Sequence, residues 1–181
     1  MIAETLTGLS EYLLKVTKTH EENPKDLLGL LNEIREANNQ EHFSEADIFD
    51  PDIAVALQAP KEDPQIAVEE FNELIRKLRQ SFQTGLIGIV RDKDLADNYQ
   101  LMNKVCASLY KVSLQTASEP LWKIAAAITD QLQQTGTPTD IDSKKALKQI
   151  DNQLKHLEET GRDGLLVNPD AALLKTLLYS V

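Results

Sequence analysis

Apolar residues recur every three or four positions through most of this chain, and that spacing limits its fold more than any other feature. It places side chains along one face of a helix, because a strand would require alternation at every second residue. The glycines and prolines lie almost entirely between the periodic stretches, where they end one helix and start the next. We therefore expect about seven helices, no convincing strand and an all-α fold, an antiparallel helical bundle.

The N-terminal part of the sequence predicts a helical hairpin. A first helix is expected from about Ala3 to His20, and Asn23-Pro24 supplies an N-cap followed by proline at the start of a second helix. The two helices are expected to pack through their apolar faces. Those faces are predicted to carry Ile2, Leu6, Leu9, Leu13 and Val16 on the first helix and Leu27, Leu30, Leu31 and Ile34 on the second.

Between Asn38 and Asp63 the helical spacing is lost, but the segment is too apolar for a solvated linker. We expect it to run across the bundle and pack on it, and its length makes it the best candidate for a domain boundary. That boundary is predicted near Pro60, with a hairpin and connecting segment at residues 1–60 and a helical bundle at 61–181. The apolar residues of the segment are Phe43, Ile48, Phe49, Ile53, Val55 and Leu57.

The longest helix is predicted to open at Asp63-Pro64, with Glu73 and Lys77 facing water as an i,i+4 pair. Gly85 and Gly88 interrupt its second half, and each would cost roughly 1 kcal/mol in an exposed helix relative to alanine. We therefore expect another helix to approach closely at these glycines. The inward face is predicted to carry Phe71, Leu74, Ile75, Leu78, Phe82, Leu86 and Ile89.

Turn and cap residues predict the remaining helix boundaries. Gly161 is expected to stop the fourth long helix of the bundle, and the stretch from Leu173 to Val181 keeps its helical pattern without a following cap. That ending is typical of a piece cut from a longer protein. The expected helix starts are the position after Arg91-Asp92-Lys93-Asp94, then Ser118-Pro120, then Asp142 or Ser143, and finally Asn168-Pro169.

Composition narrows the possible partners and compartments. The formal net charge is −10, and no stretch gathers enough lysine and arginine to neutralise a row of phosphates, which argues against nucleic acid and anionic membrane as partners. No apolar run approaches the roughly 18 residues needed to cross a bilayer, and Met1-Ile2-Ala3-Glu4 lacks the basic start of a secretory signal. Cys106 is the only cysteine and is expected to be buried. We expect a cytoplasmic protein.

The residues with catalytic or metal-binding chemistry form no recognisable site. His20, His42 and His156 lie far apart, and none stands in an H-E-x-x-H or C-x-x-C setting that would gather zinc ligands. The aspartates at 47, 50 and 52 lack the glycine and the bidentate glutamate of a calcium loop. No metal site and no catalytic residue are predicted.

The sequence also contains no motif that would bind a nucleotide cofactor or form a serine-hydrolase site. There is no G-x-G-x-x-G after a strand, no G-x-x-x-x-G-K-[ST] and no G-x-S-x-G, so neither a nucleotide cofactor nor serine-hydrolase activity is expected. Trp122, Tyr99 and Tyr110 could line a pocket, but aromatic residues on amphipathic helices are more often core packing. We predict no cofactor and no enzyme activity.

Several motifs, in the same order along the chain, resemble one family of signalling proteins. The chain is similar to the N-terminal region of ChpA/PilL-type chemotaxis hybrid histidine kinases and their kinase-less homologue FimL. The resemblance implies a two-component, chemotaxis-like system that controls type IV pili and twitching motility, and a histidine-phosphotransfer or degenerate phosphotransfer-like domain. The motifs are Leu28-Gly29-Leu30-Leu31-Asn32-Glu33-Ile34-Arg35, Phe43-Ser44-Glu45, Ile48-Phe49-Asp50-Pro51-Asp52, the stretch from Arg79 to Arg91, Pro120-Leu121-Trp122-Lys123-Ile124-Ala125 and Leu174-Lys175-Thr176-Leu177-Leu178-Tyr179.

A phosphotransfer domain needs H-x-x-K-G on a helix, so that an exposed imidazole has a lysine to offset phosphate charge and a glycine to admit the response regulator. Each of the three histidines lacks both the lysine and the glycine. If the bundle is aligned with the family's phosphotransfer fold, the residues at the position of the H-x-x-K-G motif are Ala107-Ser108-Leu109-Tyr110-Lys111. Ala107 then takes the place of the histidine, and in the adjacent register Cys106 takes it. We therefore expect a degenerate bundle that is not phosphorylated.

Three functions remain open from the sequence. The first is a scaffold or adaptor that docks a response regulator, a polar landmark protein or a chemosensory array protein, with localisation at the cell pole through such partners. The docking face of such a scaffold is expected on the exposed side of the longest helix, around Arg76 and Arg79. The second is an active phosphotransfer domain that uses His156 or another histidine, and the third is a structural spacer or dimerisation segment of a hybrid histidine kinase.

Overall fold

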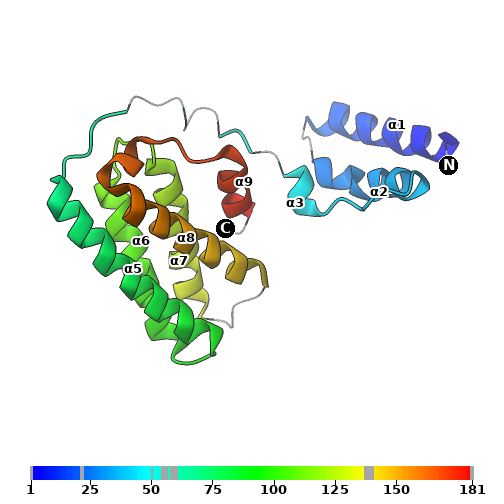
Figure 1. The fold of residues 1–181 in the computed structure, drawn as a ribbon. Coiled ribbons are helices and arrows are strands. Elements are labelled where there is room, and N and C mark those ends of the chain that lie inside the picture. The colour runs from blue at the N-terminus through cyan, green and yellow to red at the C-terminus, as the bar shows by residue number, and fades with distance from the viewer. Residues whose placement is uncertain are drawn as a thin grey trace. The chain divides into compact units, whose positions relative to one another are not determined.

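The computed structural model describes residues 2–20, 23–49, 51–53, 57, 61–136 and 141–179. Within these ranges the protein is all-α, with seven α-helices of nine or more residues and no strand (Figure 1). The predicted fold class is therefore confirmed. The chain forms two compact units, residues 1–51 and residues 52–181.

The N-terminal unit contains the predicted pair of helices, although its second helix starts with a tighter turn. It is built from α1 (Ile2–Thr19), a 3₁₀ turn η1 (Pro24–Leu27), α2 (Leu28–Ala37) and the short α3 (Glu45–Ile48). Asn23 caps η1 as expected, because its side chain accepts a hydrogen bond from the backbone N–H of Lys25 at 3.2 Å. The short α3 lies in the segment for which no helix was predicted.

The face of α1 that packs in this unit differs from the predicted stripe. Gly8 and Tyr12 are half-buried, and a Cβ built on Gly8 would lie 3.4 Å from Leu30. Of the predicted stripe, Val16 is half-buried as expected, but Leu9 and Leu13 are 41% and 55% exposed, so their predicted place on the packing face is wrong. The observed packing face differs from the predicted one because Gly8 has no side chain and lets α2 approach α1 closely at that position. Gly8 precedes Leu9 by one residue, so the packing face is rotated away from the leucines.

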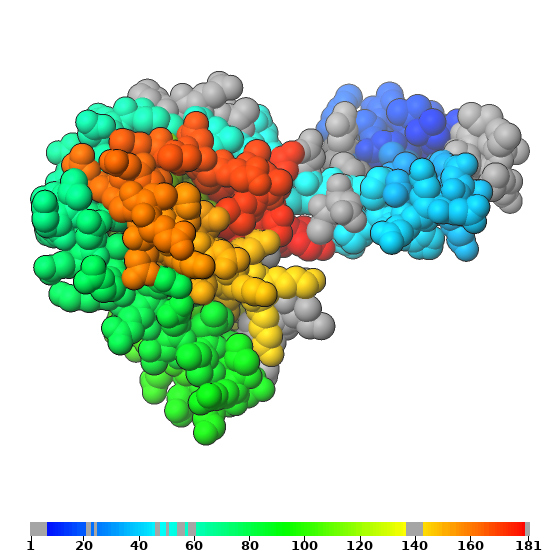
Figure 2. Space-filling view, viewed as in Figure 1, coloured from blue at the N-terminus to red at the C-terminus, as the bar shows by residue number. Residues whose placement is uncertain are grey.

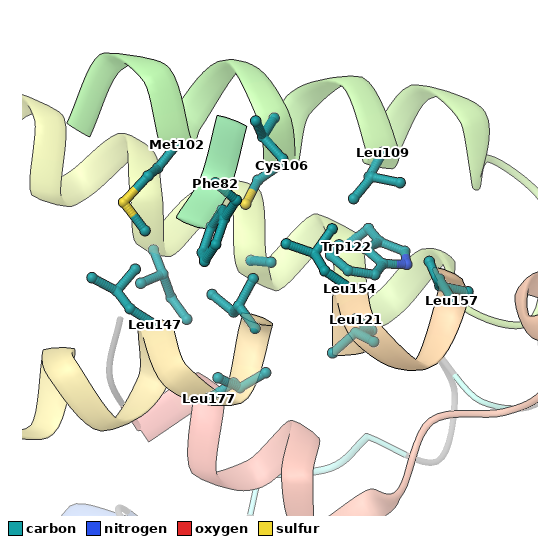
Figure 3. Packing of buried hydrophobic residues seen from close by; sticks show 14 of the residues in the cluster. Phe82, Met102, Cys106, Leu109, Leu121, Trp122, Leu147, Leu154, Leu157 and Leu177 are labelled. Carbon is teal, nitrogen blue, oxygen red and sulfur yellow. The ribbon is translucent and has the colours of Figure 1, made fainter. Parts of the chain in front are cut away.

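The C-terminal unit is a bundle of α5 (Val68–Val90), α6 (Leu95–Val112), α7 (Glu119–Thr135), α8 (Ile141–Thr160), the 3₁₀ segment η2 (Gly161–Leu166) and α9 (Ala171–Tyr179). In this unit α6 packs against both α5 and α7, α8 packs on α5, and α9 packs on α7 (Figure 1). Figure 3 shows side chains from these helices meeting in one core. This arrangement is the predicted helical bundle.

Large apolar side chains fill the centre of the bundle. Trp122, Phe71 and Phe82 are fully buried, and Tyr99 is nearly so. Burying a large apolar side chain contributes roughly 1.5–3 kcal/mol each, so this core accounts for most of the driving force for folding the unit. The aromatic residues at 99 and 122 are core packing, the interpretation that the sequence favoured.

Close helix approach at the two glycines of α5 is confirmed. A Cβ on Gly85 would lie 2.8 Å from Cγ of Met102, and one on Gly88 would lie 2.1 Å from Nδ2 of Asn98. Both neighbours belong to α6. The Asn98 amide donates a hydrogen bond to the carbonyl of Lys93 at 2.8 Å, which holds it against Gly88.

Several helix starts fall away from the predicted residues. α5 begins at Val68, not at Asp63-Pro64, and α8 begins at Ile141, so Asp142 and Ser143 stand inside it. Asn168-Pro169 does not cap α9. Instead the carboxylate of Asp170 accepts a hydrogen bond from the N–H of Ala172 at 3.2 Å, which satisfies one of the donors at the helix start. The predicted stop at Gly161 is confirmed, with φ of +66° at that glycine.

The connecting segment packs on the bundle in its second part but not in its first. Ile53 and Leu57 contact the core, and the N–H of Glu62 donates to the carbonyl of Gln115 at 2.7 Å. Residues 38–49 belong instead to the N-terminal unit, where the N–H of Phe43 donates to the side chain of Asn32 at 2.6 Å. The predicted boundary near Pro60 and the apolar residue Val55 lie outside the described residues. The two compact units meet in sequence at residues 51 and 52.

Candidate functional site

The three histidines are placed apart and away from the neighbours that a phosphorylated imidazole would need. His20 lies just past the end of α1 at φ +56°, and His42 lies between α2 and α3 with its Nε2 3.8 Å from a carboxylate oxygen of Glu36. His156 is exposed on α8. The structure therefore brings none of the three together, as their sequence separation predicted.

The surroundings of His156 are acidic. Glu158 forms an ion pair with Arg79, and Glu159 lies 3.8 Å from Lys155. The lysine beside His156 therefore already faces a carboxylate, and no H-x-x-K-G arrangement follows the histidine. A phosphoryl group on this imidazole would stand on the same helix face as the carboxylate of Glu159, three residues further on.

The expected phosphotransfer register on α6 also lacks an accessible nucleophile. Cys106 is fully buried, and burial raises the pKa of its thiol to about 12, although a side-chain hydrogen bond with Thr129 acts in the lowering direction. Ala107 is half-buried and has no group to phosphorylate. Thiolate is the reactive form of cysteine, so neither residue can accept a phosphoryl group in the folded bundle.

Across the part of the chain that the structure describes, no group of three or more His, Cys, Asp or Glu side chains could hold a metal ion. Of the aspartates considered in the sequence, Asp52 is exposed and Asp50 lies outside the described residues. No helix among the described residues is long and apolar enough to span a bilayer.

The docking face predicted on α5 around Arg76 and Arg79 has one of its two guanidinium groups already paired. Arg79 is engaged by Glu158, with side-chain exposures of 22% and 31%. Arg76 is exposed and lines a hollow of about 300 Å³ beside η2, but Glu158, Glu159 and Asp163 line the same hollow. The docking role of this face stays a prediction.

A longer groove lies between α8 and α9. Two hollows, of about 260 and 410 Å³, adjoin there and share Gln153, Asp170 and Leu173 in their walls. Figure 2 shows the yellow-to-orange surface of α8 beside the red surface of α9. We call the two hollows together the α8–α9 groove and define it by the residues that line them.

The two ends of the α8–α9 groove differ in chemistry. The end at η2 is lined by Trp122, Leu121 and Leu157 together with polar side chains, among them those of Ser118, His156 and Asn168. The other end is lined by the carboxamides of Gln149 and Asn152 and by Thr176. Such a combination of apolar and polar groups in a hollow is typical of recognition sites.

Sequence reasoning missed the α8–α9 groove. Gln149, Asn152 and Gln153 stand at the i, i+3 and i+4 positions of α8, so they share one helix face, and this pattern was readable as a polar stripe. The hollow itself depends on where α9 and the η2 segment lie against α8. That placement is tertiary and has no local signature.

Comparison with known proteins places the bundle in a family. Residues 67–181 match the family model described as the FimL scaffold protein second domain. Over 190 residues the chain is 28% identical to the scaffold protein FimL of Pseudomonas aeruginosa, an alignment that covers 99% of this chain and 32% of that protein. The chain thus spans about a third of that relative's length. No solved structure matches the chain. Because the family match covers more than half of its residues, the chain belongs to the FimL scaffold protein second-domain family.

Proposed function

We propose that this chain is a non-catalytic scaffold or adaptor module of a chemotaxis-like signal transduction system that controls type IV pili and twitching motility. The observation that carries the proposal is the match of residues 67–181 to the second domain of a scaffold protein. The expected partners are a response regulator, a polar landmark protein or a chemosensory array protein. The chain would act in the cytoplasm and reach the cell pole through these partners.

The chemistry of the described histidines supports recruitment over phosphoryl transfer. A phosphorylated imidazole needs a nearby cationic side chain to offset the negative charge of the phosphoryl group. His156 instead has Glu158 and Glu159 in the next turn, and His42 has Glu36 within 3.8 Å. The formal net charge of −10 would act on partner choice and association rate rather than on catalysis.

Calorimetry of the purified chain with the cognate response regulators and array proteins tests this proposal. We expect saturable binding to at least one of them with a dissociation constant in about the micromolar range. A receiver domain from an unrelated signalling system serves as the specificity control. No heat of binding with any cognate protein at high micromolar concentration would remove the scaffold role.

A dimerisation segment is a second candidate, and exposed leucines on α1 favour it. Leu9, Leu13 and Leu14 are 41%, 55% and 59% exposed, which leaves an apolar strip on the N-terminal unit. Light scattering over a hundredfold concentration range, about 1–100 μM, would detect self-association. If the strip forms a dimer, Leu13→Lys shifts the mass toward that of the monomer, whereas Lys18→Ala on the same helix leaves it unchanged.

A further inference from the structure

We propose that a second copy of this chain covers the outward face of α1, so that two N-terminal units join as a four-helix bundle. The proposal rests on the dimerisation candidate of the proposed function and deepens it, because it names the occupant of that face, the residues in contact and the effect of charge. Three features of the N-terminal unit support it: the little apolar surface that the unit buries, the spacing of its exposed leucines, and the uncharged residues beside them.

The N-terminal unit buries little apolar surface by itself. None of its described residues is buried, and the apolar side chains of α2 are only half-buried. Units of about fifty residues are marginally stable, and those without a sufficient core are usually held by disulfides, metals or association. Cys106, the only cysteine, belongs to the other unit, so no disulfide stabilises this one. The half-buried residues of α2 are Leu27, Leu28, Leu30, Leu31 and Ile34.

The leucines of α1 have the spacing of a seam between two helices. The apolar residues are separated alternately by four and three positions, which is the 3.5-residue repeat that keeps one side of a helix facing a partner helix. Gly8 and Tyr12 lie on the α2 side of α1, where they line a hollow with Leu30. Leu9 and Leu13, in the middle of the seam, stay 41% and 55% exposed. We call this seam the α1 stripe; in the sequence it comprises Ile2, Leu6, Leu9, Leu13 and Val16.

The positions beside the α1 stripe favour a second copy as its occupant. In paired helices these flanking positions face the partner, and charges there determine which partner is accepted. In α1 none of them is charged, so two identical stripes can meet without placing like charges opposite each other. The charged Glu4, Glu11 and Lys18 stand on the far side of the helix. The flanking residues are Ala3, Ser10 and Thr17 on one side, and Thr5, Tyr12 and Thr19 on the other.

Self-association also fixes the sign of the salt effect. The N-terminal unit, residues 1–51, contains eleven Asp and Glu and four Lys and Arg, a net charge of −7 with histidine counted neutral. Two such units repel each other at long range, and salt screens that repulsion. Raising the salt concentration from about 0.05 to 0.5 M should therefore tighten the dimer by about threefold or more. A basic occupant of the same face would be weakened by salt instead.

Sedimentation equilibrium of the full chain at concentrations of about 1–300 μM measures this association. We expect a reversible equilibrium between monomer and dimer, with a dissociation constant of about 10 μM, because each stripe is only two heptads long. A chain that stays monomeric at every concentration overturns the proposal. So does a dimer that salt weakens, because opposite charges would then hold it together.

Two adjacent leucines provide a matched pair of variants. Leu13 belongs to the α1 stripe, whereas Leu14 lies about 100° further around the helix, yet the two are similarly exposed at 55% and 59%. Leu13→Ser should weaken the dimer by about tenfold or more, and Leu14→Ser should change its dissociation constant by less than about twofold. Serine leaves the net charge unchanged, so the comparison reports on the position alone. Equal effects of the two variants would overturn the assignment to this stripe.

Disulfide crosslinking locates the contact directly. Leu9 is the middle residue of the stripe, so a two-fold axis brings it beside its own copy whether the two α1 helices run parallel or antiparallel. Because Cys106 is buried, a cysteine introduced on α1 is the reactive thiol. Under mild oxidation Leu9→Cys should form a covalent dimer at least about fivefold faster than Lys18→Cys, on the far side of α1. Equal rates for the two variants contradict the proposed contact.

These outcomes are separable from those that test the proposed function. A dimer that Leu13→Ser leaves intact overturns the stripe as the contact but leaves dimerisation standing. A chain that is always monomeric removes both, yet does not affect the scaffold role, which calorimetry with whole partner proteins tests independently. Because the proposed dimer dissociates at micromolar concentration, amides of α1 and α2 exchange through the free chain, and their protection should rise with chain concentration.

Discussion

Cys106 illustrates how a residue's surroundings decide its chemistry. It lies on α6 with no exposed surface, and burial raises the pKa of its thiol to about 12. The sequence predicted a buried cysteine, and in the bundle it packs as a small apolar side chain, as expected. Its neighbour Ala107 offers no alternative nucleophile.

The protection of this thiol is directly measurable. At pH 8 the native chain should react with a thiol-specific aromatic disulfide at least about a hundredfold slower than the chain in urea, because reaction requires thiolate and access. Cys106 is the only cysteine, so the absorbance of the released thiol reports on it alone. Equal rates with and without urea would show that α6 is open at this position.

Gly88 is a second residue at which packing outweighs helix propensity. Gly88→Ala would place a methyl group against Asn98, which its bond to the Lys93 carbonyl holds in place. We expect a loss of about 1–3 kcal/mol in the free energy of unfolding, as overpacking costs more than the propensity gain of alanine. Urea unfolding followed by Trp122 fluorescence measures it.

The control for that substitution lies one turn earlier on the same helix. Thr84 is exposed on α5, so Thr84→Ala should change the free energy of unfolding by no more than about 0.5 kcal/mol. If Gly88→Ala proves as stable as the parent chain, then α5 and α6 do not approach at Gly88 as described.

At the scale of elements, one ion pair joins α5 to α8. Arg79 and Glu158 are both partly shielded from solvent, and they lie 79 positions apart in sequence. Glu158→Gln removes the charge but not the shape, and should cost about 1 kcal/mol of unfolding free energy. The exposed Glu73–Lys77 pair at 3.9 Å gives the comparison, since Glu73→Gln should cost no more than about 0.3 kcal/mol. Equal changes in the free energy of unfolding for Glu158→Gln and Glu73→Gln, measured by urea titration, would mean that the α5–α8 pair adds no stability.

Most helices were predictable from local residues, and the misplaced boundaries have local reasons. Ser118 and Pro120 open α7 as expected, because proline at the first turn acts within one turn of chain, although the side chain of Ser118 makes no capping hydrogen bond. The start of α5 was misplaced because residues 61–67 are held by tertiary contacts, such as the bond from Glu62 to Gln115. The packing face of α1 was misplaced because two apolar faces compete there, and Gly8 rather than a leucine allows close approach.

At the scale of the molecule, the two units differ in how much they bury. In the N-terminal unit α2 has no buried residue, whereas in the C-terminal unit α5 to α8 contribute to a single core cluster. Local unfolding costs little free energy where few apolar contacts must break. Amides of α1 and α2 should therefore exchange with solvent at least about a hundredfold faster than those in the middle of α6 and α7, measured in one sample by NMR. Equal protection would show that the N-terminal unit is stabilised beyond its own contacts.

The candidate site was less predictable than the fold. The absence of a phosphotransfer motif around the histidines can be read from sequence, because H-x-x-K-G is a local pattern. The α8–α9 groove cannot, since it depends on Trp122 of α7, the amides of α8 and Asp170 before α9 converging in space. Residues that act through such convergence carry no local signal at any one position.

The most direct test of a recruiting role without phosphoryl transfer is the mass of the intact chain after incubation with a phosphorylated receiver domain. We predict that the mass stays unchanged while the receiver loses phosphate only at its own hydrolysis rate, and that His156→Gln behaves as the parent chain does. A mass increase of one phosphoryl group that His156→Gln abolishes would contradict this and make the chain a phosphotransfer protein.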